Sequence, residues 1–384
     1  MKNQLNANRE LKFPAYAKLA FVLLSLTLSL AFLYLAHGIL IPILLAMLFA
    51  ILLRPLVYFL NKRLRFPHVI ATMIAVTLFV LVLGGLIVFV SWKIGDIASD
   101  WDKIKANLNI HYHRIQYWIK QNFNISYWQQ QKYIQEAKKE TLPGTEIIGN
   151  TMSSFTDVLL NAILVPIYTF LFLLYRNLFL NFLSKLFKPE HQHRLREVLS
   201  QIKLAVQSYL IGLLIEMGIV SALTSVGLVI VGVQYPILLG VITGVLNMIP
   251  YIGILVAALL TMVATLTTSA EVSIIVGVII VNIVVQLVDN NLLVPLVVSS
   301  KVKINAFVSI VAIIVGNVLG GVSGMFLAIP LIAMLKVIFD RVEVLEPWGY
   351  VMGDDLPKTY EWGGIVLPHY DAGDLQETKP SEKK

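Results

Sequence analysis

The chain has 384 residues, of which 57% are hydrophobic and 14% charged, with a formal net charge of +7 and a mean hydropathy of +0.77. Soluble domains are roughly 45–50% apolar and about 25% charged, so this composition excludes an ordinary soluble protein and predicts lipid as the solvent. The absence of cysteine excludes disulfides, thiolate nucleophiles and Cys-ligated zinc. Because the basic residues cluster in short segments between apolar runs, they indicate membrane topology rather than nucleic-acid binding.

The N-terminal part predicts three membrane-spanning helices, at 16–36, 38–60 and 69–92, each apolar over about the length that crosses a bilayer. A basic tail precedes the first run, as in signal peptides. That run is longer than a signal-peptide core and a second one follows at once, which favours a retained helix. The loop at 61–67 carries three Lys/Arg and no acid, so the positive-inside rule places it in the cytoplasm.

Residues 93–154 interrupt the apolar pattern with eight Lys/Arg and six Asp/Glu, and predict a helical module on the outer side. Apolar residues recur there every three or four positions, the period of an amphipathic helix. They are Ile94, Ile97, Trp101, Ile104 and Leu108. We expect this stripe to pack on a neighbouring helix or lie on the membrane surface, rather than to capture a substrate.

The fourth span, at 155–175, returns the chain to the inside, since 176–203 carries six Lys/Arg and two Glu. The basic amphipathic helix there leads directly into a fifth span at 209–233. From Asp340 the chain has ten acids and five Lys/Arg, which predicts a partly ordered solvent tail.

Two later segments, 236–268 and 305–339, are too long and too interrupted by glycine and proline to be simple spans. As straight helices each would reach about 50 Å, beyond the hydrocarbon layer. We expect each to be broken into half-helices or a re-entrant hairpin, although the glycines alone could serve close helix packing. A re-entrant 236–268 places Lys301 and Lys303 inside, whereas a single crossing places them outside.

The sequence therefore predicts an all-α polytopic membrane protein of about eight transmembrane or re-entrant segments, with an extracytoplasmic amphipathic insertion. We expect a multi-pass protein of the inner (plasma) membrane with both termini in the cytoplasm. The expected divisions are 1–14 (cytoplasmic tail), 15–92 (three transmembrane helices), 93–154 (outer helical module), 155–175 (fourth helix), 176–208 (cytoplasmic basic helix), 209–339 (transport core with two broken helices) and 340–384 (cytoplasmic acidic tail).

Between Leu204 and Ser300 there is no Lys, Arg or His, and the only acids are Glu216, Glu271 and Asp289. Glu216 lies about two turns into the fifth span, where an unpaired carboxylate is costly. It is either a proton or cation site or a neutral, hydrogen-bonded structural residue. Glu271 follows a Thr-Thr-Ser turn and is expected to be an interfacial loop charge.

Asn282, Gln286 and Asp289 are separated by four and three residues and share one helix face. A polar face in a membrane helix points at protein or water. It indicates either a path for a solute or cation, or hydrogen bonds between helices. Asn290 and Asn291 more simply mark the headgroup boundary.

The chain has no phosphate-binding loop, no H-E-x-x-H motif and no G-x-S-x-G elbow. We therefore expect neither enzymatic activity nor a cofactor. The pairs His111 with His113 and His191 with His193 lack further ligands nearby in sequence, so we expect them to be exposed rather than to bind a metal.

Three stretches carry a family resemblance: GVITGVLNMIPYIG at 240–253, the glycine- and proline-rich run at 291–336, and PIYTFLFLLYRN at 166–177. Over roughly 15–340 the chain resembles the autoinducer-2 exporter family of bacterial and archaeal permeases. The resemblance implies seven or eight helices, cytoplasmic termini and homo-oligomers. It also implies either export of the furanone signal autoinducer-2 or, as for some members, sodium or lithium/proton antiport.

The chain departs from the family pattern at Asn305-Ala306, where many members have a His-Pro-like pair, and in its acidic aromatic tail. We predict a secondary transporter or exporter of a small polar solute. The alternatives are a Na⁺(Li⁺)/H⁺ antiporter using Glu216 or Asp289, and a non-transport oligomeric scaffold. The absence of basic residues from 204 to 300 argues against an anion site. The predicted solute or ion path comprises Glu216, Asn247, Pro250, Tyr251, Gly253, Asn282, Gln286, Asp289, Gly320, Gly321 and Gly324.

Overall fold

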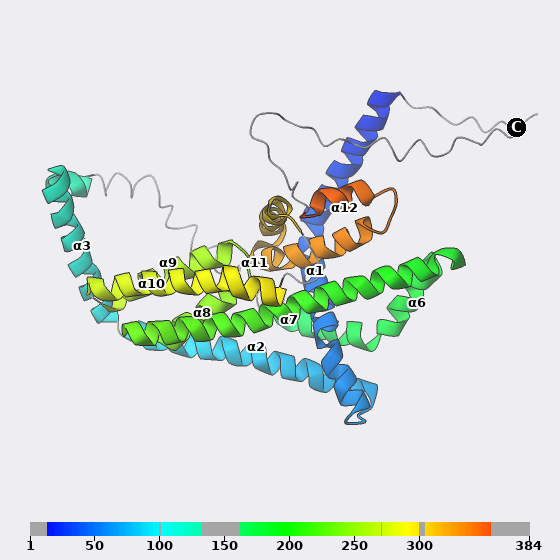
Figure 1. Ribbon diagram of the computed structural model, residues 1–384, viewed down its shortest axis with the longest axis horizontal. Helices are drawn as coiled ribbons and strands as arrows, with labels where there is room; N and C mark the ends of the chain where they lie inside the picture. The colour runs from blue at the N-terminus through cyan, green and yellow to red at the C-terminus, as the bar shows by residue number, and fades with distance from the viewer. Residues whose placement is uncertain (1–13, 100, 133–161, 270, 299–303, 355–384) are drawn as a thin grey trace, which may run out of the picture.

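The computed structural model describes residues 14–99, 101–132, 162–269, 271–298 and 304–354, and every regular element in these ranges is helical (Figure 1). The elements are α1 (Ala15–Lys62), α2 (His68–Ser99), α3 (Trp101–Phe123), two unlabelled helices (127–132 and Ala162–Leu174), α6 (Arg176–Leu186), the 3-10 turn η1 (Pro189–His191), α7 (Gln192–Val231), α8 (Pro236–Asn247), α9 (Ile252–Thr268), α10 (Val272–Val288), the π-helix η2 (Asp289–Val298), α11 (Ala306–Phe339) and α12 (Glu346–Met352). The all-α prediction is confirmed.

Within the described ranges, five helices are long and apolar enough to cross a membrane, and a sixth span forms if Ala162–Leu174 and α6, which meet at a 67° bend, are taken together. Large apolar side chains cover the outside of these helices, such as Val88 on α2 and Ile230 on α7, which are 68% and 80% exposed. A surface of this kind is stable only against lipid. The molecule is a multi-pass membrane protein.

The expected separate spans at 16–36 and 38–60 are a single 48-residue helix, α1, which is about 72 Å long. Only His37 separates the two apolar runs, and the helix tolerates Gly38 and Pro42, at the start of the second run, without ending. The first half of α1 extends beyond the bundle (Figure 1), whereas Leu48 in its second half is fully buried. The cytoplasmic N-terminus that we expected rested on two crossings before Lys62, so it stays a prediction.

Helix α7 is the central element of the fold. Its first half packs Val206 and Leu210 against Leu48 of α1 and Leu327 of α11. Its second half packs Leu228 against α8 and α10. Of the basic helix predicted at 176–208, the part from Gln192 runs without a break into the membrane-spanning part of α7, as expected. The part before it is instead a separate helix, α6, and the turn η1.

The predicted break in 236–268 falls at 248–251, between α8 and α9, and the two helices form a re-entrant hairpin. Leu239 near the start of α8 and Ala264 near the end of α9 both pack in one cluster with Leu228, near the end of α7. Both open ends of the hairpin therefore lie at the same end of α7. Its tip reaches Glu216, near the middle of α7, because Asn247 at the end of α8 bonds to that residue.

Helix α11 is broken at Gly320 (φ −155°, ψ 23°) and Gly321 (φ 54°, ψ −138°) and folds back on itself. Gly316 and Gly324 meet backbone to backbone, and Ile313 packs on Ala328 across the fold. The second interrupted segment is therefore also a hairpin rather than one crossing, although its total length counts it among the five candidate spans. Gly321 has a left-handed backbone that favours glycine.

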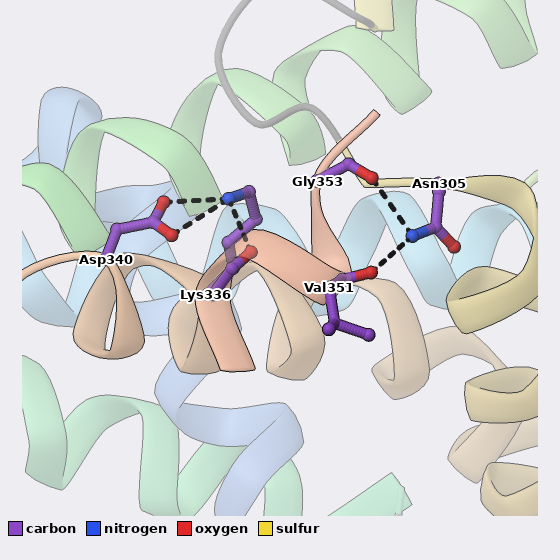
Figure 2. Close-up of polar contacts among 6 residues, drawn as sticks. Asn305, Lys336, Asp340, Val351 and Gly353 are labelled. Carbon is purple, nitrogen blue, oxygen red and sulfur yellow. Dashed lines mark hydrogen bonds and ion pairs between the residues drawn. The ribbon is translucent and has the colours of Figure 1, made fainter. Parts of the chain in front are cut away.

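Helix α12 joins the two ends of this second hairpin (Figure 2). At one end the Asn305 side chain donates to the carbonyls of Val351 at 2.7 Å and Gly353 at 3.0 Å. At the other end the Lys336 amine donates to Asp340 at 2.9 Å and to the Gly349 carbonyl at 3.1 Å. Because both ends meet one seven-residue helix, both lie on the same side of the molecule.

In the segment predicted to form the outer module, α3 covers the end of α9. Asn107 donates to the Thr267 carbonyl at 3.0 Å, and a His111 ring nitrogen lies 2.7 Å from the Ser269 carbonyl oxygen. The expectation that His111 is exposed is wrong, since it is buried among the terminal carbonyls of α9, which need partners. Of the predicted stripe, Ile104 is buried and Leu108 exposed, while the side chains of Ile94, Ile97 and Trp101 lie outside the described residues.

Candidate functional site

Two carboxyl groups share one amide in the centre of the bundle. The Asn247 Nδ2 atom donates to Glu216 Oε1 at 2.9 Å and to Asp289 Oδ2 at 3.2 Å. The three side chains come from α8, α7 and the start of η2, and they are 6%, 5% and 2% exposed respectively. The sequence predicted each of them as a candidate, but only the fold brings them together.

The cluster has unused hydrogen-bonding capacity. Glu216 Oε2, Asp289 Oδ1 and the nearby Tyr209 hydroxyl are buried, and none of these atoms has a hydrogen-bond partner. Leaving buried polar groups without partners costs about 1–3 kcal/mol each, and more for charged groups. Glu216 and Asp289 are also close enough for their charges to interact. Such an arrangement is suited to take up a proton, a monovalent cation or a polar solute.

Two local breaks in helical geometry build the cluster. Helix α8 ends at Asn247, and Tyr251 reverses the chain with φ 65° and ψ −49°. The return is possible because a Cβ at Gly253 would stand 1.7 Å from the Leu246 carbonyl oxygen, a space that only glycine leaves free. On the other side, η2 begins at Asp289, and π-helical turns are frequent at functional sites because they displace side chains from the regular face.

A cavity of about 810 Å³ opens beside the cluster. It is lined by Ala205, Tyr209, Leu213, Glu216, Asn247, Pro250, Tyr251, Ile254, Leu255, Gln286, Asp289, Asn290, Val294, Ile304, Ser309, Ile329 and Ala333. No Lys, Arg or His is among these described lining residues. We call this space the central cavity.

A second cavity of about 270 Å³ lies next to the central cavity and shares Asn247, Ile254, Gln286 and Asp289 with it. Asn282 lines this smaller cavity and donates to Thr261 Oγ1 at 2.9 Å. Asn282, Gln286 and Asp289 all line it, so the shared helix face that the sequence predicted is present.

Six of the eleven predicted path residues line the central cavity: Glu216, Asn247, Pro250, Tyr251, Gln286 and Asp289. Gly253 instead permits the contact between α8 and α9, and Gly324 the contact within α11. Gly320 lies against Ile41 of α1, and neither it nor Gly321 lines either cavity. Glycines mark where backbones approach, which need not be where a ligand passes.

The sequence reasoning did not identify three polar lining residues, Tyr209, Asn290 and Ser309. Tyr209 precedes Glu216 by seven residues, about two helical turns, so the two side chains share one face of the helix. That spacing could have identified Tyr209 from the sequence. Asn290 was expected to mark the headgroup boundary, but it lines the cavity and accepts a hydrogen bond from Gln286 at 2.9 Å. Glu271 is exposed in the turn before α10, as expected, and the described residues contain no group of three His, Asp or Glu that could hold a metal ion.

A multi-pass helical bundle with two re-entrant hairpins beside a cavity that holds buried carboxyl groups has the architecture of a membrane transporter. Comparison with known proteins agrees with this class. The family model of the AI-2E family transporters matches residues 23–343. The chain belongs to the AI-2E transporter family.

Two proteins of Bacillus subtilis (strain 168), both named for an inferred transport role, are similar to this chain. YueF is 25% identical over 313 residues, which cover 78% of this chain and 82% of YueF. YrrI is 29% identical over 129 residues, which cover 34% of this chain and 36% of YrrI.

Proposed function

We propose that the protein is a secondary transporter, without enzymatic activity, that exports a small, polar, largely uncharged solute through the central cavity. The observation that carries this proposal is the convergence of Asn247, Tyr251, Gln286 and Ser309 on a space of about 810 Å³. Small-molecule sites typically occupy about 300–1,000 Å³ and orient the ligand with a few polar groups. Because no basic side chain lines the cavity, an anionic solute would lack a counter-charge. Autoinducer-2, a small hydroxylated furanone, belongs to the favoured solute class.

The two hairpins give this proposal a mechanism. The tip of α8–α9 meets Glu216, while the arms of α11 contribute Ser309, Ile329 and Ala333 to the opposite wall. Transporters commonly place broken helices around a binding site near the bilayer midplane, where freed backbone groups face a wet cavity. Movement of either hairpin relative to α7 would open the cavity toward one side at a time.

A second candidate function, Na⁺ or Li⁺ exchange for protons, is favoured by the carboxyl pair. Each carboxyl has one oxygen engaged by Asn247 and one without a partner. Two adjacent carboxyl groups in a poorly solvated site do not both ionise easily. A proton on one of them, or a cation between them, relieves that repulsion, so either ion could drive or accompany solute movement.

Flux measurements in proteoliposomes test both candidates. We expect uptake of labelled autoinducer-2 or a related polyol by the unaltered protein. If the carboxyl pair couples transport, the uptake rate should fall at least about tenfold in Glu216→Gln and in Asp289→Asn. The matched control is Glu271→Gln, which neutralises an exposed acid outside the cavity. Na⁺-dependent proton movement that needs Glu216 with no solute flux would favour the antiporter. No flux over a broad panel would favour a non-transport scaffold, and unchanged flux in both carboxyl variants would exclude their coupling role.

We further propose a homo-oligomer in the plasma membrane with the C-terminal segment in the cytoplasm. The re-entrant α8–α9 supports this sidedness, because a crossing by α10 would then return the chain to the side of the basic loop at 61–67 before α11 begins. Since the chain has no cysteine, Arg63→Cys and Glu343→Cys can be labelled in intact cells. Both should resist a membrane-impermeant maleimide, whereas Gln121→Cys in α3 should react.

A further inference from the structure

A second large cavity, of about 740 Å³, lies between α1, the bend before α6, the first part of α7 and the end of α11. It shares no lining residue with the central cavity. Three half-buried cations line it, Arg54 of α1, Arg176 of α6 and Lys203 of α7, and Arg196 lies at its exposed edge. We call this cavity the basic pocket.

The cations of the basic pocket face one another without a counter-charge. Arg54 lies close enough to both Arg176 and Lys203 for their charges to interact. No ion pair of the described residues involves any of the three, and the only hydrogen bond of these side chains is from Arg176 to Asn177 Oδ1 at 3.5 Å. No acid is among the described residues that line the cavity. Like charges held together in a partly desolvated space are unfavourable unless an anion binds between them.

The remaining walls are mostly apolar. Phe172, Leu183 and Leu199 line the cavity beside the cations. A soluble phosphate would leave these walls unused, whereas an anion that carries hydrocarbon would cover them. Arg in particular suits the oxygen atoms of phosphate because its planar fork can donate two parallel hydrogen bonds.

The shape and exposed face of helix α6 favour a position of the basic pocket at the membrane surface. The helix leaves the preceding one at 67° and presents an apolar face, in which Leu178, Phe182 and Leu186 are 60%, 56% and 63% exposed. Amphipathic helices of this kind lie in the interface with their apolar face among the acyl chains. Arg176 at the first position of α6 is therefore at headgroup depth.

We propose that the basic pocket binds one anionic phospholipid, whose phosphate lies between Arg54, Arg176 and Lys203 and whose acyl chains follow the apolar wall formed by α6 and α7. Basic pockets between membrane helices bind anionic headgroups by this chemistry. The site is independent of the transported solute, because it lies outside the central cavity.

The test uses the full-length protein with Asn181→Cys, the only cysteine of the chain, placed in the wall of the pocket and labelled with bimane. In nanodiscs of phosphatidylcholine, brominated phosphatidylglycerol should quench the label more strongly than brominated phosphatidylcholine at equal mole fraction. The triple variant Arg54→Gln/Arg176→Gln/Lys203→Gln should lose this preference. The affinity for phosphatidylglycerol should fall about fivefold for each cation removed.

The matched control, Lys62→Gln/Arg63→Gln/Arg65→Gln, removes the same charge from exposed positions in the loop before α2 and should keep the preference. Equal quenching by the two lipids, or equal loss in both triple variants, overturns the proposal. Displacement by excess glycerol phosphate would overturn the lipid assignment in favour of a soluble phosphate ester. Should the triple variant fail to fold, Lys203→Gln alone must still weaken the preference, and an unchanged preference there overturns the proposal too.

Discussion

Gly316 and Gly324 lie backbone against backbone: a Cβ built on Gly324 would stand 2.0 Å from the carbonyl oxygen of Gly316. Residues eight apart in a straight helix are separated by about 12 Å, so this contact exists only because α11 doubles back at Gly320 and Gly321. The contact distinguishes a hairpin from a crossing. It also keeps both ends of α11 on the side where α12 joins them.

We predict that Gly324→Ala separates the arms of α11, because the added methyl group has no space against backbone atoms that cannot rotate away. Overpacking of this kind typically costs about 1–3 kcal/mol. The melting temperature in detergent, followed by fluorescence-detected gel filtration, should fall by several degrees. Gly84→Ala in α2, where nothing lies within 4 Å of the new Cβ, is the control and should leave the melting temperature nearly unchanged. Equal melting of the two variants would contradict the hairpin.

We predict that Gly253→Ala, a substitution in the α8–α9 hairpin, disturbs the central cavity. Its Cβ would collide with the Leu246 carbonyl, directly beside Asn247, so the return of the chain must open and displace the shared amide. Transport should fall at least about tenfold, as expected when a positioning residue moves by an ångström. Gly218→Ala in α7, whose new Cβ meets nothing within 4 Å, is the matched control. An unchanged transport rate in Gly253→Ala would show that the geometry of the hairpin tip does not matter for transport.

The sequence predicted both breaks because glycine and proline act locally: the chain turns within a few residues of them. It did not predict that α1 is continuous. Two apolar runs with Gly38 and Pro42 near their junction have the same sequence pattern whether the helix ends there or continues. Contacts between distant segments were also beyond its reach. His111 is buried by a carbonyl 158 positions away, and Asn247 joins residues 31 and 42 positions away. The candidate carboxylates could be found because charge is rare in a membrane segment, and Asn247 was a candidate too, but the bonds that join the three could not be predicted.

We predict that Asn247→Leu disables transport more than an ordinary cavity-wall substitution does. Leucine fills a similar volume, yet it removes the one donor that both carboxyl groups share. Solute or ion flux should drop at least about tenfold, and the purified protein should melt at a lower temperature, since each orphaned acceptor costs about 1–3 kcal/mol. Thr243→Val, one turn earlier on α8, removes only a bond to the Leu239 carbonyl and should retain flux. Retained flux in Asn247→Leu would rule out the shared amide as a functional element.

The Asn305 side chain makes two kinds of hydrogen bond that can be removed separately. Its Oδ1 accepts a hydrogen bond from the Val308 backbone at the start of α11, while its Nδ2 donates to the carbonyls of Val351, in the last turn of α12, and of Gly353, directly after it. Asn305→Asp keeps the acceptor, and aspartate starts helices well, but it turns a carboxylate toward two carbonyls. Hydrogen exchange at 346–353 should therefore rise in Asn305→Asp while exchange in the first turn of α11 stays low. Asn305→Ala should raise exchange in both places. Slow exchange at 346–353 in both variants would mean that α12 is held by the bonds that neither substitution removes. These run from the Asn305 backbone N–H to the Met352 carbonyl and from the Lys336 amine to Asp340 and the Gly349 carbonyl.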